Sequence, residues 1–134
     1  MIRGTTTSFT FKLPFKKSEI DSVKIKFWQK DIYGMDDEAT SIYKYLSNCD
    51  GSPDATELVL SLVPSETKRF SDKFKLYAQL SAKSTSGVVV ATKRHLITVY
   101  PMDDDLVMVD EVNPFPPANP DGWIILDGGA IVDE

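Results

Sequence analysis

Hydrophobic side chains recur at every second residue along much of this chain, and this spacing constrains its fold more than any other feature. In residues 6–13, Phe9 and Phe11 alternate with polar side chains, and the alternation returns at residues 23–28 and 74–82. A period of two is typical of a strand with one buried face, because successive side chains of a strand point to opposite sides. No window of roughly a dozen residues has helical periodicity. We therefore expect a mostly β protein.

Other segments complete the expected order of elements. Residues 58–63 are apolar on both faces, which predicts a central strand. The tyrosine-rich residues 41–46 predict a third strand, after a solvated acidic loop at residues 31–40. In residues 64–70 we expect one helical turn, with Ser65 as its cap.

The second half of the chain adds a hairpin and a further strand. Residues 74–82, the turn KSTSG and residues 88–100 predict a β-hairpin. Residues 106–112 are expected to form one more strand. About six to eight short strands separated by turns indicate an all-β fold, an antiparallel β-sandwich of immunoglobulin-like or jelly-roll-like type, which we favour over a small barrel.

Length and composition are those of one globular domain. The chain has 134 residues, of which 42% are hydrophobic and 26% charged, which is enough to build one core but not two. Cys49 is the single cysteine, so we expect no internal disulfide. The first residues, MIRGTTTSFTFKLPF, contain no apolar run of signal-peptide length, and we expect a soluble protein made in a cytosol, with no membrane partner.

Charge is divided unevenly between the two ends of the chain. Residues 1–100 contain all 15 Lys and Arg residues and 11 acidic residues, whereas residues 101–134 contain 9 acidic residues and no Lys or Arg. The body therefore carries +4 and the tail −9, within the net charge of −5. This asymmetry predicts attraction between the tail and a body, of the same subunit or of a neighbouring copy.

The tail combines a proline-rich stretch with a short apolar run. Four prolines lie within NPFPPANPDG, residues 113–122, which predicts an extended and fairly stiff segment. We therefore divide the chain into a sandwich domain, residues 1–112, and an extended C-terminal arm, residues 113–134. The apolar side chains of the arm are candidate interface residues: Phe115, Trp123, Ile124, Ile125 and Leu126. As an alternative, residues 123–126 form the last strand of the sandwich.

A search for catalytic residues leaves no candidate. The single histidine, His95, lies in an expected strand and shares a face with Ile97 and Val99, which favours a structural role over a catalytic one. Cys49 precedes Asp50 in an acidic turn, without the nearby positive charge that lowers a thiol pKa. We expect no enzyme activity and no cofactor.

Metal and nucleic-acid sites are also disfavoured. One Cys and one His cannot complete a zinc site, and the acidic clusters at residues 36–38 and 103–105 lack the spacing of a calcium loop, so solvated loops are favoured there. Lys24, Lys26 and Lys30 form a potential basic patch beside Trp28. Alternating lysines are more often the solvated face of a strand, and the acidic tail would repel nucleic acid.

The order of four segments resembles a known group of proteins. These segments are IRGTTTSFTFKLPF, IDSVKIKFWQKD, LVLSLVPSETKRF and KLYAQLSAKSTSGVVVATKRHLITV. Over residues 2–100 the chain is similar to small tailed-phage and prophage proteins, and to the N-terminal β-sandwich domain of phage baseplate upper proteins. The long segment 31–54 and the acidic end 101–134 depart from that pattern. The resemblance implies a virion component, assembled in the host bacterial cytoplasm.

Two functional hypotheses follow. The first is a virion structural or adaptor protein of the tail, baseplate or head, whose partners are other copies of itself and other virion proteins, with the arm inserting Trp123 and Ile125 into a neighbour. The second is a carbohydrate- or host-surface-binding module that presents an aromatic platform. Its candidate side chains are Trp28, Tyr33, Tyr43 and Tyr45.

Overall fold

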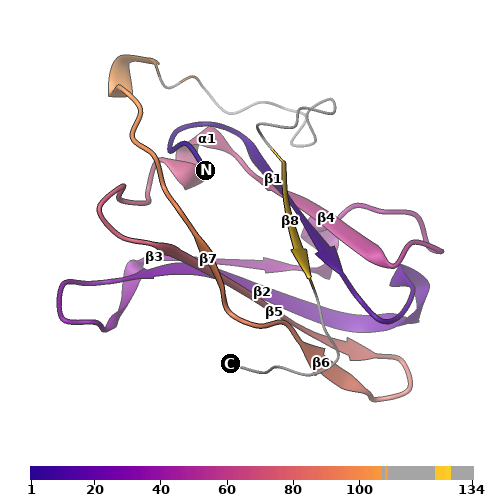
Figure 1. The fold of residues 1–134 in the computed structure, drawn as a ribbon. Helices are drawn as coiled ribbons and strands as arrows, with labels where there is room; N and C mark the ends of the chain where they lie inside the picture. Colours follow the sequence, from indigo (N-terminus) through magenta and orange to yellow (C-terminus); the bar gives the residue numbers. More distant parts are fainter. Residues whose placement is uncertain (107, 109–122, 128–134) are drawn as a thin grey trace.

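A computed structural model describes residues 1–106, 108 and 123–127. Over these residues the protein is all-β, with strands that pair mostly antiparallel and very little helix (Figure 1). The strands are β1 (Thr7–Lys12), β2 (Ile20–Lys30), β3 (Asp36–Tyr45), β4 (Glu57–Leu62), β5 (Leu76–Ser84), β6 (Val89–Ala91), β7 (His95–Ile97) and β8 (Trp123–Asp127). The expected all-β class is confirmed.

The smaller sheet has the order β4-β1-β8. Strand β4 runs antiparallel to β1, whereas β8 runs parallel to it. The prediction that residues 58–63 form a central strand is therefore wrong, because β4 lies at one end of this order. Its outward side chain Val59 is half-buried, and the backbone of Asp50 pairs with Val59 along the outer edge of β4. Strand β4 is thus an outer strand whose outer edge is partly paired.

The larger sheet has the order β3-β2-β5-β6, and β7 also pairs with β5. The expected hairpin forms, but its second half is divided into β6 and β7. At the division the Thr92 backbone N–H donates to the Leu80 carbonyl at 2.9 Å, and the Thr92 hydroxyl accepts from the Leu80 N–H at 3.0 Å. A side-chain oxygen thus replaces a backbone acceptor where the ladder breaks.

The segment between β2 and β3 is shorter than predicted. Residues 31–40 were expected to be a loop, but β3 already begins at Asp36. The Asp31 carboxylate accepts from the backbone N–H groups of Tyr33 and Met35, and Gly34 has φ of 77°, a left-handed conformation that favours glycine. This tight turn aligns Asp36 with Lys30, so the acidic residues enter the sheet.

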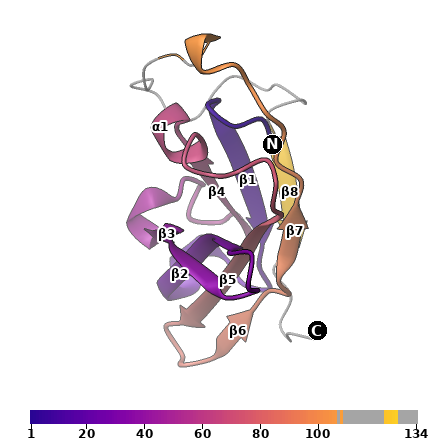
Figure 2. The same ribbon diagram turned by 90° about the vertical axis from the view of Figure 1, so that its left-hand side faces the viewer.

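The two sheets lie face to face and share one hydrophobic core, as Figure 1 and Figure 2 show from two directions. Phe9 and Phe11 on β1 belong to this core together with Ile25 and Phe27 on β2, and all four side chains are fully buried. The rings of Phe9 and Phe27 lie 4.8 Å apart, centroid to centroid. The alternation seen in the sequence therefore does mark the inner faces.

Backbone contacts also join the two ends of the main body. The N-terminal amine of Met1 donates to the Thr98 carbonyl at 2.9 Å, and the Arg3 N–H donates to the Tyr100 carbonyl at 3.0 Å. Since residues 98–100 follow β7 of the larger sheet, these bonds link the start of the chain, just before β1, to the other sheet.

The expected helical turn is present as α1 (Pro64–Thr67), but its predicted cap is wrong. The N-cap is Val63 rather than Ser65, and the Glu66 carboxylate accepts from the Val63 N–H at 3.1 Å. Pro64 occupies the first helical position, where its missing N–H costs no hydrogen bond. The turn therefore starts earlier than a serine cap would allow.

Most of the expected C-terminal arm lies outside the described residues, including the proline-rich residues 113–122. The strand predicted at 106–112 is not observed at its start, because Asp104–Leu106 is a 3-10 turn; residues 107 and 109–112 lie outside the described part. Within that part, no helix has the length and apolar character needed to cross a bilayer.

Candidate functional site

The candidate interface residues at the end of the chain fall in one strand. Trp123, Ile124, Ile125 and Leu126 are consecutive in β8, and β8 adds to the edge of β1 in a parallel register that sets Ser8 opposite Trp123. Phe115 lies outside the described residues. The structure thus places this apolar run beside β1, the position that the last-strand alternative describes.

Strand β1 is buried on both of its faces. Its outward side chains Ser8 and Thr10 are 0% and 5% exposed, and the Ser8 hydroxyl lies 2.7 Å from the hydroxyl of Ser61 on β4. Buried polar side chains need hydrogen-bond partners, and the serine pair supplies one across the strands. The backbone of β1 is paired on one edge with β4 and on the other with β8.

The two residues considered for nucleophilic catalysis lie in different settings. His95 begins β7 and is half-buried on the side of Ile97 and Val99, as the alternation predicted. The Cys49 thiol donates to the Tyr45 carbonyl at 3.5 Å, and burial raises the thiol pKa to about 11. The expectation that Cys49 lacks nearby positive charge is wrong.

Lys17 and Lys44 both lie near Cys49 and lower its pKa, but desolvation outweighs them. The Lys17 ammonium is also occupied, since it donates to the Cys49 carbonyl and the Gly51 carbonyl, each at 3.3 Å. At neutral pH the side chain is therefore a thiol, which is a weak nucleophile.

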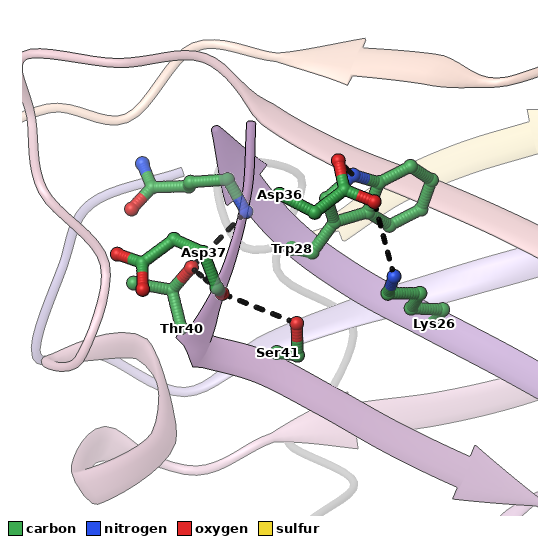
Figure 3. Close-up of polar contacts among 7 residues, drawn as sticks. Lys26, Trp28, Asp36, Asp37, Thr40 and Ser41 are labelled. Atoms are coloured by element: carbon green, nitrogen blue, oxygen red, sulfur yellow. Dashed lines mark hydrogen bonds and ion pairs between the residues drawn. The ribbon is translucent and has the colours of Figure 1, made fainter. Parts of the chain in front are cut away.

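Asp36 and Asp37 of the acidic cluster at residues 36–38 are engaged in local contacts, several of which Figure 3 shows. The Asp37 carboxylate accepts from the Ala39 N–H at 3.0 Å, while its backbone carbonyl accepts from the hydroxyls of Thr40 and Ser41. In the second cluster the Asp103 carboxylate accepts from the Asp105 N–H. Within the described ranges, no three His, Cys, Asp or Glu side chains gather as a metal site would require.

A set of cationic and aromatic side chains gathers on the outer face of the larger sheet. We call it the cation–aromatic face, and it comprises Lys24, Lys26, Trp28, Lys30, Tyr43, Tyr77 and Arg94. It arises from register: Lys26 on β2 lies opposite Tyr43 on β3, and Trp28 lies opposite Tyr77 on β5. Since alternate residues of a strand share a face, the lysines and Trp28 emerge on the same side.

Each cation of this face lies over an aromatic ring. The Lys26 Nζ is 4.8 Å from the Trp28 ring centroid and 5.9 Å from that of Tyr43, and the Lys24 Nζ is 5.0 Å from that of Tyr43. Lys30 and Arg94 lie over Tyr77, at 5.4 and 5.6 Å. Cations within about 6 Å of a ring centroid are attracted by the ring quadrupole.

Trp28 is the most constrained member of the face. Its ring stacks on Tyr77 with centroids 5.4 Å apart and an interplanar angle of 21°. Its indole Nε1 donates to the Asp36 carboxylate at 3.1 Å, and the other oxygen of Asp36 lies 3.5 Å from the Lys26 Nζ (Figure 3). Although Trp28 points outward it is 5% exposed, because Lys26 and Tyr77 flank it.

The sequence identified part of this face. It singled out Trp28, Tyr43 and the three lysines, and the structure brings these together. Tyr45 lies on the same strand as Tyr43, opposite Lys24, whereas Tyr33 lies apart in the turn before β3 and is 82% exposed. Tyr77 and Arg94 were not singled out, because only the pairing of β5 with β2 sets Tyr77 opposite Trp28, and Arg94, between β6 and β7, reaches this face by lying over Tyr77.

A hollow of about 410 Å³ opens on the cation–aromatic face. Lys24, Lys26, Trp28 and Tyr43 line it from β2 and β3, and β5 contributes Gln79 and Ser81. Its lining therefore offers ring faces, ammonium groups, an amide and a hydroxyl in one place.

A larger polar hollow, of about 690 Å³, lies beside Cys49, where Lys44 and Glu66 form an ion pair at 2.7 Å.

Comparison with known protein families finds no match for this chain, and comparison with curated proteins finds none either.

Proposed function

We propose that this chain is a structural or adaptor protein of a bacteriophage virion, which joins the tail, baseplate or head through protein–protein contacts and performs no catalysis. Its fold would be a β-sandwich of immunoglobulin-like or jelly-roll-like type with an extended proline-rich C-terminal arm. Support for the sandwich comes from the two facing sheets and their shared core of Phe9, Ile25 and Phe27. Support for assembly through protein–protein contacts comes from strand β8, near the C-terminal end of the chain.

The observation that carries the proposal is the pairing of β8 with β1. The last described strand adds in parallel to the first, over five register pairs from Ser8 with Trp123 to Lys12 with Asp127. Strand addition to a sheet edge is a recurrent mode of recognition, in which backbone hydrogen bonds supply affinity. A sheet edge filled by a segment from the distant end of the chain is suited to exchange between identical subunits.

Sequence features of the segment before β8 are consistent with exchange. Residues 113–122 contain four prolines, and a stiff segment loses less conformational entropy on docking than a flexible one. The tail is acidic and the body basic, which favours encounter between copies. We therefore propose that β8 of one copy pairs with β1 of the next, at the register seen here.

Cross-linking tests whether the strand is exchanged. In a Cys49→Ser background, one tagged copy carries Thr10→Cys and a differently tagged copy carries Ile125→Cys, the residue opposite it in the register. The proposal predicts a disulfide-linked heterodimer on mild oxidation. The matched control, Ile124→Cys, is one position out of register and should cross-link much less.

A different cross-linking result would contradict the exchange of β8 between copies. If the mixed copies do not cross-link, while a single chain with both cysteines closes an internal disulfide, then β8 stays on its own subunit. Deletion of residues 113–134 adds a second measure. Loss of oligomers with an unchanged circular dichroism spectrum supports the proposal, and unfolding of the domain or unchanged assembly counts against it.

The virion setting is tested separately from strand exchange. The genes that flank the one encoding this chain should encode capsid or tail proteins, and the protein should be found by mass spectrometry in purified phage particles. The proposed partners are other copies of this chain and other virion proteins, assembled in the host bacterial cytoplasm. Absence from the particles would refute this setting even if β8 were exchanged.

A further inference from the structure

We propose that the hollow on the cation–aromatic face is a binding site for an acidic carbohydrate, a sugar that carries a carboxylate such as a uronic acid. This site is on the larger sheet and is independent of the β1–β8 pairing, so it does not rest on the assembly proposed above.

The first support is the density of positive charge on this face. Lys24, Lys26 and Lys30 all emerge from β2 and point to the same side. Of these three lysines, Lys26 forms an ion pair with Asp36, and the Asp36 carboxylate also accepts the Trp28 N–H. Lys24 and Lys30 make no ion pair with a described carboxylate. The ammonium groups are thus arranged to receive an anion from outside.

The second support is an accessible aromatic ring, Tyr43, in a lining whose other ring, Trp28, is already held in place. Trp28 is 5% exposed and stacks on Tyr77, and its bond to Asp36 is shown in Figure 3, so it is a fixed part of the lining rather than an open ring face. Tyr43, 39% exposed, forms the accessible wall next to Lys24 and Lys26. The C–H bonds of a pyranose ring carry partial positive charge and are attracted to the negative face of an aromatic ring.

The third support is the polar lining and the size of the hollow. Gln79 and Ser81 line it beside the rings and lysines, and their amide and hydroxyl groups are suited to sugar hydroxyls. The volume of about 410 Å³ lies in the range of roughly 300–1,000 Å³ that is usual for small-ligand sites. Ring faces, hydroxyl partners and cations within one such hollow match an acidic sugar better than a neutral one.

The geometry is less suited to a nucleic acid. Sequence-tolerant binding of single strands uses several open aromatic faces on which successive bases stack. Of the two rings that line this hollow, Tyr43 is exposed, whereas Trp28 is 5% exposed between Lys26 and Tyr77. The net charge of −5 also opposes a long polyanion. A short acidic sugar needs one accessible ring and carries few carboxylates, so it avoids both obstacles.

Binding can be measured with tri-galacturonic acid as the probe, by titration calorimetry and by tryptophan fluorescence. Trp123→Phe leaves Trp28 as the single tryptophan, so a fluorescence change then reports on this face. We expect saturable binding that weakens as salt is added. A neutral trisaccharide should bind at least about tenfold more weakly, because it lacks the carboxylates that the lysines attract.

Matched variants locate the site. The double substitution Lys24→Gln and Lys26→Gln should lower affinity for the probe about tenfold or more, and Tyr43→Ala should lower it by a similar factor. Lys68→Gln and Lys12→Gln remove exposed lysines elsewhere and should leave affinity unchanged. Circular dichroism of each variant confirms that the fold is retained.

Three outcomes would overturn the proposal. The first is the absence of binding to the acidic trisaccharide. The second is equal binding of acidic and neutral sugars, or equal effects of the face variants and the control variants. The third is displacement of the sugar by a thymidine oligonucleotide of matched charge that binds more tightly, which would assign the face to nucleic acid.

Discussion

Lys44 and Glu66 form an ion pair, Nζ to Oε2 at 2.7 Å, that joins β3 of the larger sheet to the helical turn after β4 of the smaller one. The two side chains are 18% and 20% exposed. Glu66 also accepts from the Val63 N–H, so a single carboxylate both caps α1 and connects the two sheets.

Removing this ion pair should destabilise the protein measurably. We expect Lys44→Met to lower the free energy of unfolding by about 1–2 kcal/mol, because it leaves a mostly buried carboxylate without its cation. Glu66→Ala should cost more, since it also removes the cap of α1. Urea unfolding measures both variants.

The control is Lys26→Met, which breaks the more exposed pair with Asp36, 3.5 Å long. It should cost about 0.5 kcal/mol or less. Equal losses for Lys44→Met and Lys26→Met would show that burial of the Lys44–Glu66 pair has no energetic consequence.

Gln29 should be one of the least replaceable polar residues of the protein. Its side chain is 1% exposed, its amide Nε2 donates to the carbonyls of Ser71 and Phe74, and its Oε1 accepts from the Ser71 N–H. Gln29→Met leaves these backbone groups buried without partners, and we expect a loss of about 2–4 kcal/mol in chemical unfolding.

Gln79 is the matched control for that substitution. It is half-buried and makes one described bond, from its Nε2 to the Thr92 carbonyl. Water can replace that bond, so Gln79→Met should cost about 1 kcal/mol or less. A Gln29→Met variant as stable as Gln79→Met would contradict the role of the buried amide.

The Cys49 thiol should react slowly at neutral pH. Burial raises its pKa from 9.0 to about 11, so the rate of alkylation by iodoacetamide should rise through pH 9–10 and reach its half-maximum near pH 11. A half-maximum near pH 8.5 would contradict the burial of the thiol.

The same pKa shift predicts how stability changes with pH. The folded protein holds the thiol proton more tightly than the unfolded chain, so stability is unaffected by Cys49 below pH 9 and falls as pH rises from 9 through 11. The loss should be on the order of 2–3 kcal/mol. Cys49→Ala should lack this component, which a comparison of the two unfolding curves at pH 8 and pH 11 will show.

Trp28 should stabilise the larger sheet by both stacking and hydrogen bonding. Trp28→Phe keeps a ring beside Tyr77 but loses the bond to Asp36, and we expect a loss of about 1 kcal/mol. Trp28→Ala removes the ring as well and should cost about 3 kcal/mol or more. Tyr43, which is 39% exposed, provides a control, since Tyr43→Phe should change stability by less than about 0.5 kcal/mol. Equal losses for Trp28→Phe and Trp28→Ala would show that the stack on Tyr77 adds nothing.

Much of the fold could be predicted because its cause is local. The inner faces of β1, β2, β4 and β5 follow from alternation, and Phe9, Phe27, Leu60 and Leu80 are all fully buried as that pattern requires. The errors occur where a contact distant in sequence decides the outcome. Residues 36–40 look like a solvated loop until the turn at Asp31 aligns them with β2. Strand β4 looks central from its two apolar faces, but it lies at one end of the order β4-β1-β8.

For the cation–aromatic face, too, part of the arrangement could be predicted from local sequence and part could not. Lys24, Lys26 and Trp28 could be assigned to one side of a strand from their spacing, because a strand has a period of two. That Tyr77 and Arg94 join them, and that Asp36 holds the indole of Trp28, depends on strand register, and register is determined by long-range pairing and turns rather than by the residues of one strand.

By itself, the sequence determined that this protein is all-β, which side of each main strand is buried, and that a basic body precedes an acidic, proline-rich end. Burial on alternate positions and charge composition are properties of single segments, so one chain suffices to reveal them. Only the tertiary structure decided which strands are neighbours, that β8 lies parallel to β1, and that cations and rings meet on one face. Those relations are set by the packing of two sheets around Phe9 and Phe27, to which residues far apart in sequence contribute together.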